Sequence, residues 1–198
     1  MRRLTLSVIG MLLVGCDRGP TATPSATTSR TTPASAVSGS VSRDGVSFPV
    51  VEAYASWEPK KRALTFLLLP TVLTPEERVK VQKETPFFTL CRKTSPDPAK
   101  WKQYPYAEFE LTFAEGAGRA RENITTLHLF GYSIKKEGMS DNFNTGGADA
   151  VERVKALDLK VDDVGGSVTL ATDGDESYMD GKFGWTLNLT LPVSVKKE

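Results

Sequence analysis

Residues 183–195 read FGWTLNLTLPVSV and carry the strongest secondary-structure signal in the chain. Large apolar side chains occupy every odd position, from Phe183 and Trp185 to Val195, and small or polar residues stand at the even positions. Successive side chains of a β-strand point to opposite faces of its sheet. The alternation therefore predicts a long strand with one apolar and one polar face.

Two shorter stretches repeat this pattern. Apolar residues alternate with charged or polar ones over 107–113, where Ala, Phe, Leu and Phe share one side, and over 157–161. Asp44-Gly45 lies between two strand-like runs and predicts a hairpin. From Val46 to Trp57 the apolar phase changes from even to odd positions, which predicts a bulge within one strand.

One helix is indicated by Thr74-Pro75-Glu76-Glu77. Thr74 is a suitable cap, Pro75 suits the first turn, and Glu77 can reach back to the cap. The following residues, to about Lys83, have no wide apolar stripe, so this helix is expected at the surface. Long helices between the strands are not indicated, and a parallel sheet would need them. The sequence thus predicts an all-β fold, an antiparallel β-sandwich or barrel with one or two short surface helices.

The composition fits an ordinary folded domain. The chain has 198 residues, 25% of them charged, with a formal net charge of +1. A near-neutral chain gives no electrostatic reason to expect a nucleic-acid partner. Residues 38–198 are expected to form a single β domain.

The N-terminus has the features of an export signal. Arg2 and Arg3 precede an apolar run, Leu4 to Val14, which is shorter than the ~20 residues of a membrane-spanning helix. The run ends in Leu13-Val14-Gly15-Cys16, which resembles the lipobox of bacterial lipoproteins. The resemblance implies that residues 1–15 are a signal peptide, that Cys16 becomes the lipidated first residue, and that fatty acids such as palmitate anchor the chain. The domain would then lie outside the cytoplasm, in the cell envelope or periplasm.

Residues 16–37 are expected to form a tether after the lipidated cysteine. Between residues 17 and 38, Thr, Ser, Ala and Pro account for 17 of 22 positions. Such a composition has too little apolar surface to offset the entropy of ordering.

A second resemblance concerns the start of the domain. The pattern GSVSRDGVSF at 39–48, the following EAYA at 52–55, and Gly181-Lys182-Phe183 near the end are similar to a broad group of all-β bacterial envelope proteins. The resemblance implies an envelope β domain and no particular activity.

The sequence offers few candidates for catalysis. His128 is the single histidine, and Cys91 is the single cysteine besides Cys16. These two residues are too few for a zinc site with several Cys or His ligands. The sequence motifs of common hydrolases are also missing. No cofactor and no catalytic residue is predicted.

The densest acidic stretch, residues 173–180, is interpreted as a hairpin loop. Asp173, Asp175 and Ser177 have the 1-3-5 spacing of a calcium-binding loop, although Tyr178 stands where the turn requires glycine. They are a weak candidate metal site. Trp101, Tyr104 and Tyr106 lie outside the regular strands, and they are the candidate exposed aromatic residues for binding a partner.

Three functions remain open from the sequence. The first is a membrane-anchored, non-enzymatic binding or scaffolding module for an envelope protein. The second is a carrier of a small apolar ligand inside a β-barrel. The third, less favoured, is an enzyme that uses the carboxylates of residues 173–180.

Overall fold

The computed structural model describes residues 35–83, 106–132, 142–178 and 181–196. All of them belong to one compact unit. The predicted signal peptide, Cys16 and most of the predicted tether lie outside the described residues. The first strand begins at Ala36, which is earlier than the predicted start of the domain at residue 38.

The described residues contain ten strands, one α-helix and two short 3-10 helices. In chain order these are β1 (Ala36–Arg43), β2 (Val46–Pro49), β3 (Glu52–Glu58), β4 (Ala63–Leu69), α1 (Pro75–Lys83), β5 (Tyr106–Phe113), η1 (Arg121–Asn123), β6 (Ile124–Tyr132), β7 (Asn142–Gly147), η2 (Asp149–Arg153), β8 (Val154–Val161), β9 (Gly166–Tyr178) and β10 (Gly181–Val195).

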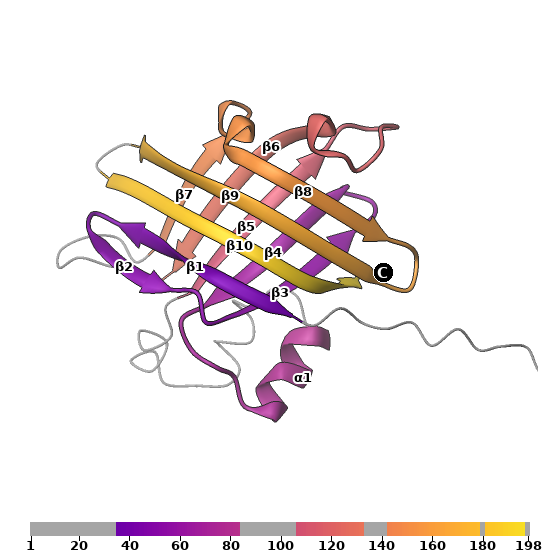
Figure 1. Ribbon diagram of the computed structural model, residues 1–198, viewed down its shortest axis with the longest axis horizontal. Coiled ribbons are helices and arrows are strands. Elements are labelled where there is room, and N and C mark those ends of the chain that lie inside the picture. The colour runs from indigo at the N-terminus through magenta and orange to yellow at the C-terminus, as the bar shows by residue number, and fades with distance from the viewer. Residues whose placement is uncertain (1–34, 84–105, 133–141, 179–180, 197–198) are drawn as a thin grey trace, which may run out of the picture. The chain divides into compact units, whose positions relative to one another are not determined.

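The strands form one curled sheet, which confirms the all-β prediction. The sheet runs β2-β1-β10-β3-β4-β5-β6-β7, and β9 and β8 continue from the other side of β10. Figure 1 shows β1, β8, β9 and β10 crossing in front of β4 to β7, so the sheet folds its two halves over each other as a half-barrel. One pairing departs from the predicted antiparallel arrangement, because β3 pairs with β10 in parallel.

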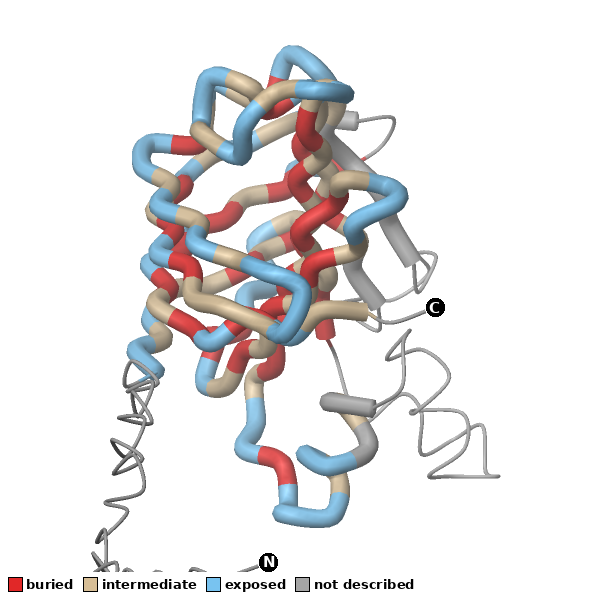
Figure 2. Tube along the Cα trace, turned by 90° about the vertical axis from the view of Figure 1, so that its right-hand side faces the viewer, coloured by how far each residue is buried: buried red, intermediate tan, exposed pale blue. Residues whose placement is uncertain are grey.

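The core lies between the two halves of the sheet. Phe109 on β5 lies 6.1 Å from Phe66 on β4 and 6.3 Å from Trp185 on β10, measured between ring centroids. Figure 2 shows the buried residues concentrated along the facing strands. The alternation predicted for residues 183–195 is confirmed, since the odd positions from Phe183 to Val193 are buried and none of the even ones is. Side chains, rather than open space, thus occupy the interior that these residues enclose.

The hairpin prediction is confirmed, and the bulge prediction is wrong. Asp44 and Gly45 both have positive φ, 50° and 80°, as the tight turn between β1 and β2 requires. The change of apolar phase after Val50 marks the end of β2 and the start of β3. The two strands pair with different partners. The even positions of β2 and the odd positions of β3 therefore both face the same core.

The predicted helix forms with its predicted cap. The Glu77 carboxylate accepts hydrogen bonds from the Thr74 amide at 2.8 Å and hydroxyl at 2.9 Å, and the Glu77 amide donates back to the Thr74 hydroxyl at 3.3 Å. The outer face of β4 near this helix carries a second, smaller apolar cluster: Leu67, Leu69, Leu73 and Tyr106, with Tyr54 and Val81 packed against it.

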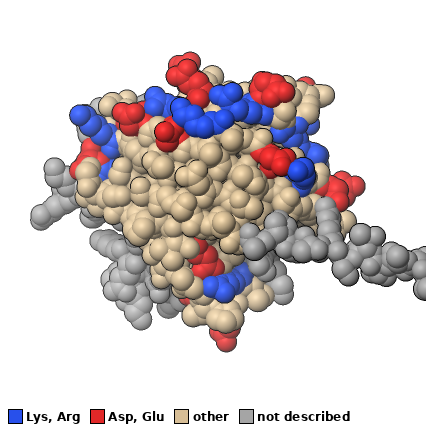
Figure 3. Space-filling view, in the orientation of Figure 1, with Lys and Arg blue, Asp and Glu red and all other residues tan. Residues whose placement is uncertain are grey.

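The outer face of β1 and β10 is polar but weakly charged. Its outward side chains are mostly hydroxyls and amides, including Ser38, Ser40, Thr186, Asn188 and Thr190. Figure 3 shows most of the acidic and basic residues toward the margins of this view, where the two signs are interspersed. The visible face therefore has no large patch of a single charge.

Candidate binding groove

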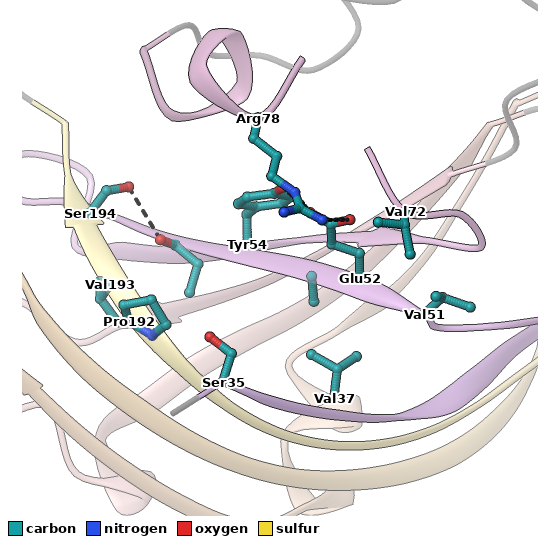
Figure 4. Close-up of a pocket in the computed structure, with 12 residues that line it drawn as sticks. Ser35, Val37, Val51, Glu52, Tyr54, Val72, Arg78, Pro192, Val193 and Ser194 are labelled. Atoms are coloured by element: carbon teal, nitrogen blue, oxygen red, sulfur yellow. Dashed lines mark hydrogen bonds and ion pairs between the residues drawn. The ribbon is translucent and has the colours of Figure 1, made fainter. Parts of the chain in front are cut away.

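A groove of about 760 Å³ opens where β1 and β3 separate beside β10 (Figure 4). Val37 of β1 and Ser35 lie on one side, and Glu52 and Tyr54 of β3 lie on the other. Val193 and its neighbours on β10 close one end. The volume is within the usual range of small-molecule sites.

The groove exists because β10 pairs with two strands along the same edge. Residues 183–190 of β10 pair with β1, and residues 193–195 pair with β3. The Lys196 amide donates to the Trp57 carbonyl at 2.9 Å, which fixes the phase of the parallel ladder. In that phase the next bond toward Ala53 would run from the amide of residue 192 to the Ala53 carbonyl.

Residue 192 is proline, which has no amide hydrogen to donate. The parallel ladder therefore stops at Ala55, and β3 leaves β10 before reaching Ala53. Pro192 lines the groove at this point. Pro192 thus removes one hydrogen bond that would continue the parallel ladder, next to the residues of β10 that β1 already occupies.

The floor of the groove is apolar and is built from small side chains. Ala53, Ala55 and Val193 are 7%, 4% and 4% exposed. The mouth carries two unusually exposed apolar residues, Val51 at 45% and Val72 at 60%. Small floor residues leave room for an occupant, and the exposed valines would lose contact with water if one bound.

Glu52 holds the rim of the groove to helix α1. Its carboxylate accepts hydrogen bonds from the Tyr54 hydroxyl, the Leu73 amide at 2.7 Å, and Arg78 Nε at 2.8 Å and Nη2 at 3.3 Å. The side chain of Glu52 is only 14% exposed, and that of Arg78 is 44% exposed. The cluster joins β3, the segment before α1, and α1 itself.

The electrostatics of this cluster fit a structural role. Burial alone would raise the pKa of Glu52, but the hydrogen bonds from Tyr54, Arg78 and Leu73, together with the charge of Arg78, hold it below its usual value. Burial and the neighbouring carboxylate raise the pKa of Tyr54 far above its usual value. At neutral pH Glu52 is therefore ionised and Tyr54 is protonated, and neither group is poised to exchange a proton near pH 7.

The predicted acidic loop is not a loop. Asp173, Asp175 and Ser177 lie in β9, paired with Thr186, Gly184 and Lys182 of β10. Alternate residues of an extended strand lie about 7 Å apart on one face, so their oxygens do not converge on one ion. The sequence analysis did not predict a strand here, because residues spaced 1-3-5 fit both a calcium-binding loop and one face of a strand.

The acidic residues of β9 are paired with basic side chains instead. Lys155 Nζ lies 3.3 Å from Asp173, and Arg153 Nη1 lies 3.7 Å from Asp175. Within the described parts of the chain, no three His, Cys, Asp or Glu side chains form a cluster that could hold a metal ion. Asp175 is 99% exposed, as expected for a solvated surface residue.

The predicted aromatic site is described only at Tyr106. Tyr106 is 3% exposed and packs in the small cluster with Leu67, Leu69 and Leu73, so it is not an exposed anchor. Trp101 and Tyr104, like Cys91, lie outside the described residues. The prediction of an exposed aromatic residue is therefore wrong for Tyr106, and it is not tested for the other two.

A further pair of carboxylates, Glu108 and Glu110, lies on the outer face of β5. Burial raises the pKa of Glu108, aided by Glu110 and opposed by the charge of Lys196. His128 is opposite Glu110 on β6, and its ring lies 5.8 Å from that of Phe130. Neither carboxylate lines the groove between β1 and β3.

Sequence reasoning missed the groove. Its only sequence signals are Pro192 within a long strand and the phase change at Val50–Val51, and both have ordinary explanations at an edge or a bulge. Recognising the groove required knowing that β1 and β3 share one edge of β10.

Comparison with known proteins adds no family to this description. No family model, no curated protein and no solved structure matches the chain significantly. Within the described segments, no helix has the length and apolar character needed to cross a membrane.

Proposed function

We propose that this chain is a membrane-anchored envelope lipoprotein whose β domain is a non-enzymatic binding module. The observation that carries the proposal is the groove between β1 and β3. It has an apolar floor and exposed valines at its mouth, and its charged residues are held in mutual hydrogen bonds. Such a lining favours binding over proton transfer.

The position of the groove supports a tethered module. Ser35, which lines the groove, lies near the end of residues 16–37, the Thr- and Ser-rich segment that the sequence assigns to the tether. Cys16, at the start of that segment, is the proposed lipidation site. Two or three acyl chains on one residue would hold the chain firmly at a membrane.

The carrier of a small apolar ligand is the second candidate. The interior between the two halves of the sheet is filled by side chains such as Phe66, Phe109 and Trp185. A carrier would therefore use the groove, whose volume of about 760 Å³ is suitable for a small molecule.

Anchoring is tested by a Cys16→Ser variant expressed in the native host. We expect the variant to leave the membrane fraction or to stay unprocessed, because it cannot be acylated. Mass spectrometry of the wild type should show acyl groups on Cys16. A processed Cys16→Ser protein that remains tightly bound to membranes would overturn this part of the proposal.

Binding at the groove is tested by photo-crosslinking in the same host. A photoreactive amino acid replaces Val72, which is 60% exposed at the groove, or Val164, which is 80% exposed in the β8–β9 turn and serves as the control. We expect a discrete adduct at position 72 only. A protein-sized adduct supports the binding module, and an adduct of a few hundred daltons supports the carrier. Equal labelling at both positions, or none at either, would contradict binding at this groove.

A further inference from the structure

The groove is bordered on the β1 side by a free strand edge. β2 pairs with β1 from Arg43 to Ser40, and the Val50 amide then donates to the Gly39 carbonyl at 2.8 Å. Backbone groups of alternate residues point to the same edge of a strand. The amide and carbonyl of Val37 therefore point in the same direction as those of Gly39, beyond the point where β2 has turned away into β3.

The opposite border of the groove presents a second free residue. Ala53 has the same parity as Ala55 and Trp57, which bond to β10, so its amide and carbonyl point toward the groove. The Ala53 carbonyl receives no hydrogen bond from residue 192, because proline has no amide hydrogen. Among the described residues, the sheet pairing supplies no partner to the groove-facing backbone groups of either Val37 or Ala53.

We propose that the groove binds an extended polypeptide segment of a partner protein, which pairs with β1 in line with β2. This inference rests on the proposed binding function and specifies the class of ligand. The segment would take the place that β2 would occupy if the chain did not turn at Val50. Recognition of a peptide by an exposed strand edge is a general binding mode.

The backbone groups favour a peptide over an acyl chain. A hydrocarbon chain in the groove would cover the amides and carbonyls of Val37 and Ala53 without hydrogen-bonding them, which costs free energy for each group. A peptide backbone supplies both donors and acceptors. The groove therefore matches a peptide in its polar edges as well as in its apolar floor.

The lining also indicates which side chains the segment would carry. In a strand beside β1, alternate side chains would face the floor formed by Ala53, Ala55 and Val193, and the others would face outward. The rim carboxylate, Glu52, is already neutralised by Arg78 at 2.8 Å. Uncharged residues with apolar side chains at alternate positions fit this environment best.

The test measures amide hydrogen exchange at Val37 and Ala53 by NMR, in full-length lipoprotein kept in mild detergent. The probe is the peptide acetyl-Lys-Thr-Val-Thr-Val-Thr-Lys-amide. The first control is the same peptide N-methylated at its threonines and valines, which keeps the side chains but cannot donate. The second control is palmitate. Amides of the β8–β9 turn, residues 162–165, serve as the internal reference.

Binding slows exchange of a protected amide by a factor of 1 + [L]/Kd, so about 2 mM probe should slow it roughly threefold for a Kd of about 1 mM. We expect this slowing at Val37 with the peptide, and none with either control. Slowing with palmitate to the same extent would overturn the peptide inference while leaving a binding module in place. No slowing with the peptide, or amides at Val37 and Ala53 that are already protected without it, would also overturn the inference.

A variant provides an independent check. Pro192→Ala supplies the amide that can donate to the Ala53 carbonyl, so it should extend the parallel ladder and narrow the groove. We expect a slowly exchanging amide at position 192 and the loss of most of the roughly threefold slowing that the peptide produces at Val37. Undiminished binding together with a protected amide at position 192 would contradict the assigned geometry. Membrane anchoring is tested separately with the Cys16→Ser variant, so failure of the peptide inference would not affect that result.

Discussion

Replacing Glu52 by glutamine should loosen the contact between helix α1 and the sheet. Glu52 accepts four hydrogen bonds, from the Tyr54 hydroxyl, the Leu73 amide and two nitrogens of Arg78. Glutamine keeps the shape and one acceptor oxygen, but its amide group faces the donors of Arg78 and its charge is lost. The variant therefore separates the contribution of the charge from that of packing.

The expected loss is about 2 kcal/mol at pH 7, because hydrogen bonds to a charged group contribute about 1.5–3 kcal/mol and glutamine retains part of them. We assign this figure to the half-buried bonds from Leu73 and Tyr54, since the exposed Arg78 pair is screened by solvent. For a domain of this size the loss corresponds to a decrease in Tm of roughly 4–8 °C. Glu76→Gln, on the exposed face of the same helix, is the matched control and should leave Tm unchanged.

The difference between wild type and Glu52→Gln should depend on pH. The folded-state pKa of Glu52 is lower than its ordinary value of 4.5, so its stabilising effect is complete above that value. The effect is lost as pH falls through the folded-state pKa, where wild-type Glu52 becomes protonated. Thermal unfolding followed by tryptophan fluorescence between pH 7 and pH 3 measures this. A difference that is absent at pH 7, or that persists undiminished at low pH, would refute the reasoning.

Two further predictions concern the core and the acidic strand. The buried Trp185 Nε1 donates to Thr172 Oγ1 at 3.1 Å, so Thr172→Val, which keeps the shape, should destabilise the fold by about 1–3 kcal/mol in urea unfolding; an unchanged midpoint would contradict the role of this bond. Asp173 and Asp175 lie on extended backbone, so the double asparagine variant and the wild type should show the same Tm response to about 5 mM calcium, which exceeds the weakest typical site affinities. A calcium-dependent rise in Tm that only the wild type shows would restore the metal site.

Local rules predicted the elements that depend on neighbouring residues. The Thr74 cap and Glu77 form their reciprocal hydrogen bonds, and Asp44-Gly45 adopts the positive φ angles of a tight hairpin. Strand parity was also predictable where one face is buried, as for residues 107–113 and 183–193. In each case a few consecutive residues contain all of the determining chemistry.

Features that depend on distant pairing were not predictable. The change of phase at Val50–Val51 fits a bulge or the end of a strand equally well, and only the different partners of β2 and β3 decide between them. The acidic stretch from Asp173 fits a loop as a sequence, but its pairing with β10 makes it a strand. The parallel contact of β3 with β10 joins residues more than 130 positions apart, which no local pattern specifies.

The treatment of strand edges supports a binding role for the groove. Unpaired edges are a liability, and proteins usually cover or interrupt them. Here β2 is short and ends in Pro49, and on β8 the carbonyls of Val154 and Val161 accept hydrogen bonds from Arg121 and Arg119. Among the described residues, nothing comparable covers the edge of β1 at Val37. Replacing Pro192 by a residue with an amide hydrogen would allow β3 to pair further along β10, which would narrow the groove. An edge left open beside an apolar floor, in a sheet where β2 is short and β8 is partly covered, is better explained by an occupant than by chance.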